Sequence, residues 1–109
     1  MTIDFDDCIK LEDMCTQSDF IVRNLNTATE DMADAEVELS LAIASCNIKD
    51  SLTWKKQIIE LIKQDEKYVE VYKKYSNAKT QVSINRGLLR ALETRINCLK
   101  KKISVTPAI

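Results

Sequence analysis

Apolar residues in the first half of the chain recur at the spacing of a coiled-coil helix. Every seventh residue from Leu11 gives one row of a stripe, which reads Leu11, Ser18, Leu25, Met32, Leu39 and Cys46. The companion row lies three residues further on and reads Met14, Ile21, Ala28, Ala35 and Ala42. The stripe holds for roughly five heptads and predicts a long helix whose apolar edge packs against a partner helix.

The second half carries a longer stripe of the same kind. Its first row reads Trp54, Leu61, Tyr68, Tyr75, Val82, Leu89, Ile96 and Ile103. Its second row reads Gln57, Gln64, Val71, Ala78, Asn85, Leu92 and Leu99. One helix over residues 53–103 would be roughly 75 Å long at 1.5 Å per residue. A helix of that length cannot bury its stripe alone, so it needs a partner.

A short connection separates the two stripes. Asn47 favours the end of the first helix, and Asp50, Ser51 or Thr53 can cap the next one. A connection this short implies antiparallel neighbours. The pattern therefore predicts an all-α fold, a long antiparallel helical hairpin of coiled-coil type in a single domain over residues 1–109. Its parts are an acidic arm over about 5–46, a turn at 47–52, a basic long helix over about 53–103 and a tail at 104–109.

The first arm can also be divided. Asn24 and Asn26 are weak helix formers, and they precede Thr27–Glu30, which has the spacing of a capping box. A break near residues 24–28 would make the beginning of the arm a short extra N-terminal helix.

Four residues interrupt the second stripe or its helix. Gln57, Gln64 and Asn85 occupy seam positions, where buried amides select register or oligomer state; the alternative is that they face water because the helix bends. Gly87 costs about 1 kcal/mol relative to Ala inside a helix and marks either a kink or a close approach of another backbone.

The two predicted arms differ in length. The second arm outruns the first by roughly two turns of helix, which leaves the end of the second stripe without a cover inside one hairpin. An exposed apolar stripe is an association surface. The predicted oligomerisation residues are Leu89, Leu92, Ile96, Leu99 and Ile103.

The composition agrees with helices, and the charge is unevenly distributed. The 109 residues include one Gly and one Pro, and the net charge is −1. Residues 1–50 hold twelve acidic against three basic side chains, giving −9, and residues 51–109 hold five against thirteen, giving +8. Either the two arms neutralise each other, or the second half binds an anionic partner.

The sequence offers no catalytic apparatus. It has no histidine, the commonest general base and a usual zinc ligand, and it has no glycine-rich phosphate loop. Its acid pairs fall on helical faces where carboxylates are ordinarily solvated. We therefore expect a protein that is not an enzyme and has no catalytic residues, metal site or cofactor.

The cysteines and termini indicate a cytoplasmic protein. The residues from Met1 to Asp7 are acidic where a signal peptide would be basic, and no apolar run is long enough for a membrane helix. Four cysteines lie far apart without a CxxC pair, so we expect reduced thiols. Apolar neighbours favour packing roles for Cys15 and Cys98.

Cations recur along the second helix, and Arg86, Arg90 and Lys100 lie roughly on one side of it, off the apolar stripe. The candidate nucleic-acid contacts are Arg86, Arg90, Arg95, Lys100 and Lys101. Cations along a helix suit a phosphate backbone, and aromatic faces can stack on unpaired bases; the candidate aromatics are Trp54, Tyr68, Tyr72 and Tyr75. The alternative is that the lysines only solubilise the helix and the aromatics only fill the core.

The second half resembles the C-terminal half of the UvsY-type recombination mediators of phages. The resemblance covers roughly residues 50–103, and residues 20–46 more loosely. The residues that carry it are Trp54-Lys55-Lys56, Lys63-Gln64-Asp65, Tyr68, Ala78-Lys79 and the run from Leu88 to Ile96. It implies a small helical protein without enzymatic activity that assembles through its C-terminal helix, binds single-stranded DNA and helps to load a recombinase.

The first half departs from this family. The family has a Lys/Arg motif in the region corresponding to about residues 36–49, where Lys49 is the only cation here. DNA contacts would therefore have to come from the second helix. Our leading hypothesis is an oligomeric accessory protein of recombination that binds single-stranded DNA and has a recombinase or a single-strand-binding protein as its partner. The alternative is a coiled-coil adaptor, chaperone or structural spacer that binds only protein.

Overall fold

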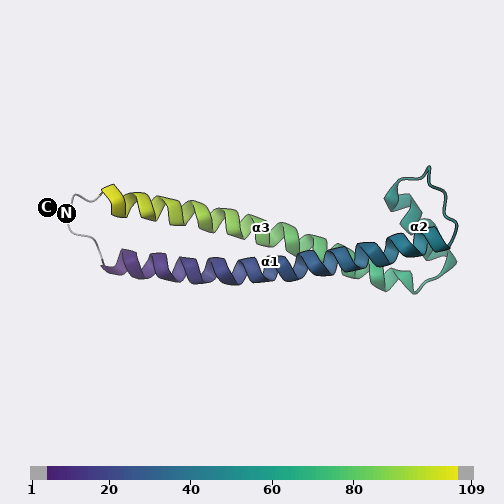
Figure 1. The fold of residues 1–109 in the computed structure, drawn as a ribbon, viewed down its shortest axis with the longest axis horizontal. Helices are drawn as coiled ribbons and strands as arrows, with labels where there is room; N and C mark the ends of the chain where they lie inside the picture. The colour runs from purple at the N-terminus through teal and green to yellow at the C-terminus, as the bar shows by residue number, and fades with distance from the viewer. Residues whose placement is uncertain (1–4, 106–109) are drawn as a thin grey trace. The chain divides into compact units, whose positions relative to one another are not determined.

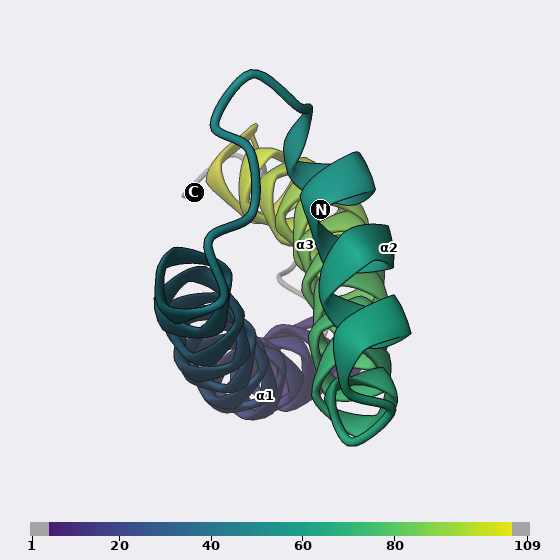
Figure 2. The ribbon, with the colours of Figure 1, turned by 90° about the vertical axis from the view of Figure 1, so that its right-hand side faces the viewer.

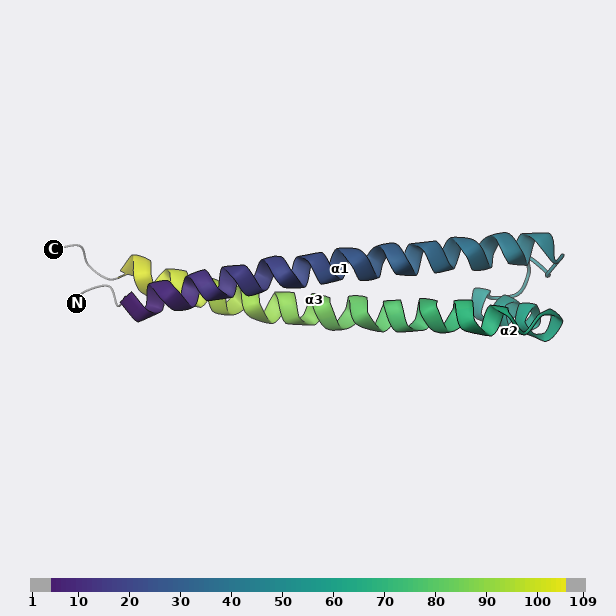
Figure 3. The ribbon, with the colours of Figure 1, turned by 90° about the horizontal axis from the view of Figure 1, so that it is seen from below.

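The computed structural model describes residues 5–105 and contains three helices there. They are α1 (Phe5–Ser45), α2 (Trp54–Gln64) and α3 (Tyr68–Val105), and no strand occurs within this range. α1 packs against α3, and the two helices run in opposite directions (Figures 1 and 3). The predicted all-α helical hairpin is confirmed. Residues 1–4 and 106–109, which include most of the predicted tail, lie outside the described range.

The seam of α1 consists of the residues that the heptad pattern selected. Ala28, Ala35, Leu39 and Ala42 are buried, and Leu25 is half-buried like the other large seam residues before it. The neighbouring positions on the remaining sides are mostly exposed, so the period of the apolar residues defines which face α1 buries.

α1 does not break near residues 24–28. The helix continues from Phe5 to Ser45, and Asn24 and Asn26 are exposed on it. Because Leu25 and Ala28 keep the seam unbroken, packing outweighs the weak helix propensity of the two asparagines. The alternative of a short extra N-terminal helix is wrong.

Asn47 ends α1, as predicted. Its φ of 53° lies in the left-handed region, which asparagine adopts more readily than most residues. The amide of Ile48 donates to the carbonyl of Ile43 at 3.4 Å, and both side chains are buried in the same cluster. This combination of a backbone bond and an apolar contact is the Schellman type of helix end.

The predicted single helix over residues 53–103 is wrong, because the chain breaks at residues 65–67. Asp65 caps the C-terminus of α2, and its Oδ1 accepts a hydrogen bond from the amide of Lys67 at 3.1 Å. Aspartate competes with the helix for backbone donors in this way. At the other end of α2, Thr53 is the N-cap, and its side chain accepts from the amide of Lys56 at 3.5 Å. α2 therefore lies beside the first turns of α3 (Figure 2).

The chain forms two compact units. One, the three-helix unit, spans Thr27–Val82 and contains the end of α1, all of α2 and the beginning of α3. The other, the two-helix unit, contains the described residues up to Asn26 and those from Ser83 onward.

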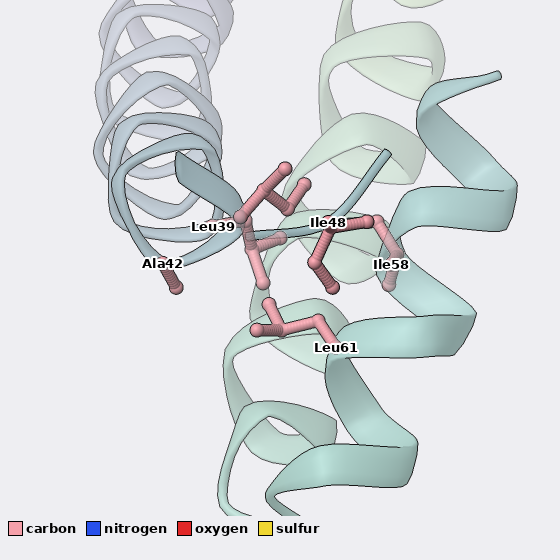
Figure 4. Packing of buried hydrophobic residues seen from close by; sticks show 6 residues of the cluster. Leu39, Ala42, Ile48, Ile58 and Leu61 are labelled. Atoms are coloured by element: carbon pink, nitrogen blue, oxygen red, sulfur yellow. The ribbon is translucent and has the colours of Figure 1, made fainter. Parts of the chain in front are cut away.

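The three-helix unit has a closed apolar core. Leu39, Ile58 and Leu61 are its largest fully buried side chains. Figure 4 shows Leu39 and Ile48 converging with Ile58 and Leu61, so that residues from α1, the loop and α2 meet. Gln57 supports the loop, because its Nε2 donates to the carbonyl of Lys49 at 3.1 Å.

The two-helix unit buries less. Leu92 and Ile96 are buried on α3, as is the seam amide Asn85. The predicted oligomerisation residues Leu89, Leu99 and Ile103 are half-buried.

The expected overhang of the second arm is absent from the described helices. α1 has 41 residues and α3 has 38, because the break at 65–67 separates α2 from the long helix. Leu92 and Ile96 are therefore covered within one chain, and the predicted stripe is not a bare association surface.

Candidate nucleic-acid interface

The candidate interface lies on the part of α3 that belongs to the two-helix unit. The buried seam residues Asn85, Leu92 and Ile96 fix which side of this helix faces α1. A helix turns by about 100° per residue, so Arg86, Arg90, Lys100 and Lys101 all lie on one side of it, next to the seam. Their side chains are exposed. We call these four residues the basic flank.

The acidic helix beside the basic flank leaves three of its four cations without an ion pair within residues 5–105. Within the described residues, Arg86, Arg90 and Lys100 make no ion pair. An ion pair does join the two helices close to their ends, where Lys102 Nζ lies 2.9 Å from Asp7 Oδ2. The prediction that the arms merely neutralise each other therefore does not account for these three cations.

Arg95, the fifth predicted contact, lies on the opposite side of α3. It is five residues from both Arg90 and Lys100, which places it about half a turn away from the middle of the basic flank. It is exposed and has no ion pair within residues 5–105. Its neighbours on that side are Leu88 and Ala91, so the structure does not bring Arg95 together with the other four cations.

The aromatic residues belong to the core of the three-helix unit. Trp54 packs edge-on against Tyr75 with ring centroids 4.9 Å apart, and Tyr72 stacks on Tyr75 at 6.2 Å. These rings and Tyr68 are half-buried against the apolar cluster. Of the two alternatives for the aromatics, the packing role is the one that the structure supports.

One lysine in the same unit interacts with the α2–α3 corner. Lys67 Nζ lies 5.1 Å above the centre of the Tyr68 ring and 3.5 Å from Asp65 Oδ2. Tyr68 first and Asp65 second raise the pKa of Lys67 above its ordinary value. These interactions stabilise the α2–α3 corner. Lys67 is not part of the basic flank, which belongs to the two-helix unit.

The cysteines differ from the prediction at two positions. Cys15 and Cys98, expected to pack, are exposed, whereas Cys46 is half-buried against the core. Cys15 and Cys98 occupy positions beside the seam rather than in it, so their apolar sequence neighbours do not cover them. All four thiols are free.

The described residues contain no group that could hold a metal ion through three or more acidic, thiol or imidazole side chains. Between residues 5 and 105 there is also no helix with the length and apolar character needed to span a bilayer. Comparison of the chain with family models, with curated proteins and with solved structures gives no match.

Sequence reasoning missed the buried residues Ile43, Ile48 and Ile58 because they lie off the heptad rows. For the basic flank, the sequence did contain a signal that shows which cations share one side of the helix. The angular separation of Arg95 from Arg86, Arg90 and Lys100 follows from their numbering once this part of α3 is taken as helix.

Proposed function

We propose that this protein is a non-enzymatic accessory protein that binds single-stranded DNA through the basic flank of α3. The observation that carries the proposal is that Arg86, Arg90 and Lys100 are exposed and make no ion pair with any other described residue, although an acidic helix packs alongside. Unpaired cations on one side of a helix are free to neutralise phosphates. The residues from Arg86 to Lys101 extend along about 22 Å of helix, enough for a few nucleotides.

The resemblance to UvsY-type mediators favours single-stranded DNA over duplex DNA and a role in loading a recombinase. The exposed residues Glu36 and Glu38 of α1 occupy the region of the family's Lys/Arg motif, and their charge would repel phosphate. The binding surface in this protein is therefore α3 alone.

Binding on this surface depends on charge and not on base stacking. No aromatic residue lies between Arg86 and Lys101. Affinity should therefore be insensitive to base sequence and should fall steeply with salt, with a slope of log K against log salt of roughly −3 for four phosphate contacts on a single strand.

The test is a titration of a labelled oligonucleotide, followed by fluorescence anisotropy over a salt series. The variant Arg86→Gln/Arg90→Gln should lower affinity at least about tenfold at low salt and reduce the slope to roughly −1.5, because two phosphate contacts are lost. The matched control Lys55→Gln/Lys56→Gln removes the same charge from α2 and should leave both values close to those of the natural chain.

Two results would contradict the proposal. One is no binding of the natural protein at low salt, where phosphate contacts are strongest. The other is an equal loss in the control variant, which would show that the total charge of the chain and not the basic flank is responsible. A duplex of the same sequence in parallel tests the preference for single strands.

The second candidate is a coiled-coil protein that binds only other proteins, as an adaptor, chaperone or spacer. Phe20 favours it, because this aromatic side chain is exposed on the acidic half of α1. An exposed aromatic on an acidic helix is suited to a basic apolar partner surface. A protein with this function would not bind the oligonucleotide at any salt concentration in the same titration.

A further inference from the structure

The outward side of α1 in the three-helix unit carries an apolar pair with acids beside it. Val37 and Leu41 are one turn apart and are 58% and 64% exposed. Glu30 and Asp34 continue the same line towards the N-terminus, and both are exposed. The four residues lie on one face of the helix because they are separated by four, three and four positions. We call them the acidic stripe.

α3 carries a corresponding stripe in the two-helix unit. Ile84 and Leu88 are one turn apart and are 48% and 51% exposed. Ala91 and Arg95 continue the line towards the C-terminus and are exposed. The separations are again four, three and four. We call these residues the basic stripe; it includes Arg95, the cation that does not belong to the basic flank.

We propose that the acidic stripe of one copy of this chain binds the basic stripe of a second copy, with the two helices antiparallel. Because the separations are equal, the residues meet in order when one stripe is read backwards. Leu41 then faces Ile84, Val37 faces Leu88, and Glu30 faces Arg95. Apolar side chains meet at one end of the contact and opposite charges meet at the other.

Charge complementarity favours a second copy of this chain as the partner that binds the acidic stripe. Glu30 and Arg95 make no ion pair within the described residues, so each is available to the other. The acidic stripe requires a partner with an apolar pair and a cation two helical turns beyond it, and the basic stripe of every copy provides that pattern. The self-association does not depend on the proposed binding of nucleic acid.

The contact joins two different surfaces, so it is heterologous, and each copy has one surface of each kind. Copies therefore add head to tail. Because a few exposed side chains make up the contact, it is smaller than a standard interface, and association should require high protein concentration.

The decisive experiment is sedimentation velocity of the full chain, without nucleic acid, from about ten micromolar to about one millimolar. The sedimentation coefficient of the natural chain should increase with concentration. Leu41→Asp and Leu88→Asp should each remain monomeric, since each has lost one stripe. Both positions are exposed, and circular dichroism will verify that the variants fold.

An equimolar mixture of these two variants distinguishes the proposal from other modes of association. Each variant keeps one intact stripe, so the mixture should form a complex of two chains and nothing larger. A mixture that stays monomeric would overturn the proposal, and so would species larger than two chains or association of either variant alone.

A charge exchange tests the predicted register. Glu30→Arg and Arg95→Glu should each weaken association about tenfold, because like charges then face each other, and the double variant should recover it. The control Arg90→Glu changes the charge of the basic flank and should leave association unchanged. Equal weakening by this control, or no recovery in the double variant, would overturn the pairing of Glu30 with Arg95.

The same variants separate this proposal from the proposed function. Arg95→Gln should leave the salt slope of oligonucleotide binding unchanged, and Arg86→Gln/Arg90→Gln should leave the sedimentation profile unchanged. Self-association and oligonucleotide binding can therefore each be disproved without affecting the other.

Discussion

The two units bury the same kind of heptad seam to very different extents. In the three-helix unit, Leu39 and Leu61 have no exposed surface, since α2 closes the side of the seam that α1 and α3 leave open. In the two-helix unit, large seam residues such as Met14, Ile21 and Leu89 remain half-buried. A pair of helices has no third element to cover the margins of its seam, and its buried positions include the polar residues Asp7 and Asn85.

This difference in burial indicates that the two units have different roles. Burial of apolar surface is the main favourable term in folding, so most of the stability should come from the three-helix unit. The two-helix unit carries the basic flank on exposed positions that packing does not constrain. The following substitutions test this division, beginning with the largest expected effect.

Truncation of a seam leucine should cost far more in the three-helix unit than in the two-helix unit. Leu61→Ala should lower the free energy of unfolding by roughly 3–5 kcal/mol, because it leaves a cavity in a closed core. Leu89→Ala should cost roughly 1–2 kcal/mol, since water already reaches this side chain. Urea unfolding followed by circular dichroism measures both. Equal losses would refute the distinction between the units.

The ion pair between Asp7 and Lys102 should be the strongest polar interaction between the ends of the two-helix unit. Lys102→Met should lower the free energy of unfolding by about 1–2 kcal/mol, because Asp7 is buried and would lose its charged partner at 2.9 Å. The matched control Lys100→Met removes an exposed cation that has no ion pair in the described part of the chain, and it should change stability by less than about 0.5 kcal/mol.

The double variant Asp7→Leu/Lys102→Met sharpens this test. It removes the buried carboxylate together with its partner and should recover most of the loss. If Lys102→Met alone has no effect in urea unfolding, water compensates for the pair, and the ends of the unit are held by apolar contacts only.

Gly87→Ala should stabilise the protein slightly. Gly87 lies within α3, its φ is not positive, and an added Cβ would meet no atom within 4 Å. Alanine should therefore raise the free energy of unfolding by about 1 kcal/mol through helix propensity. Neither a close approach of another backbone nor a break in α3 occurs at this position in the structure. A decrease in the midpoint urea concentration would show that the glycine is needed for a bend in solution.

The heptad pattern predicted the hairpin because the spacing of the apolar residues, which defines the pattern, also determines which face each helix buries. It missed the break at Asp65 because Leu61 and Tyr68 remain one heptad apart across it, so the rows continue without a visible gap. An aspartate inside a helix costs only about 0.7 kcal/mol, too little to separate a cap from an interior position by propensity alone.

The pattern also missed Ile48 and Ile58, which are buried only because α2 folds back. Their burial is a tertiary effect that neither local propensity nor the period records. For the candidate interface, the cations themselves were predictable from the charge of the second half. Which of them lack an ion pair depended on the three-dimensional arrangement of the acids in α1.

The edge-on contact of Trp54 with Tyr75 has a practical consequence. The chain has one tryptophan, and it lies in the three-helix unit. Its intrinsic emission therefore reports the folding of that unit alone, whereas far-ultraviolet ellipticity sums over all three helices. If the two signals separate along a denaturation curve, the two-helix unit melts as an independent cooperative element.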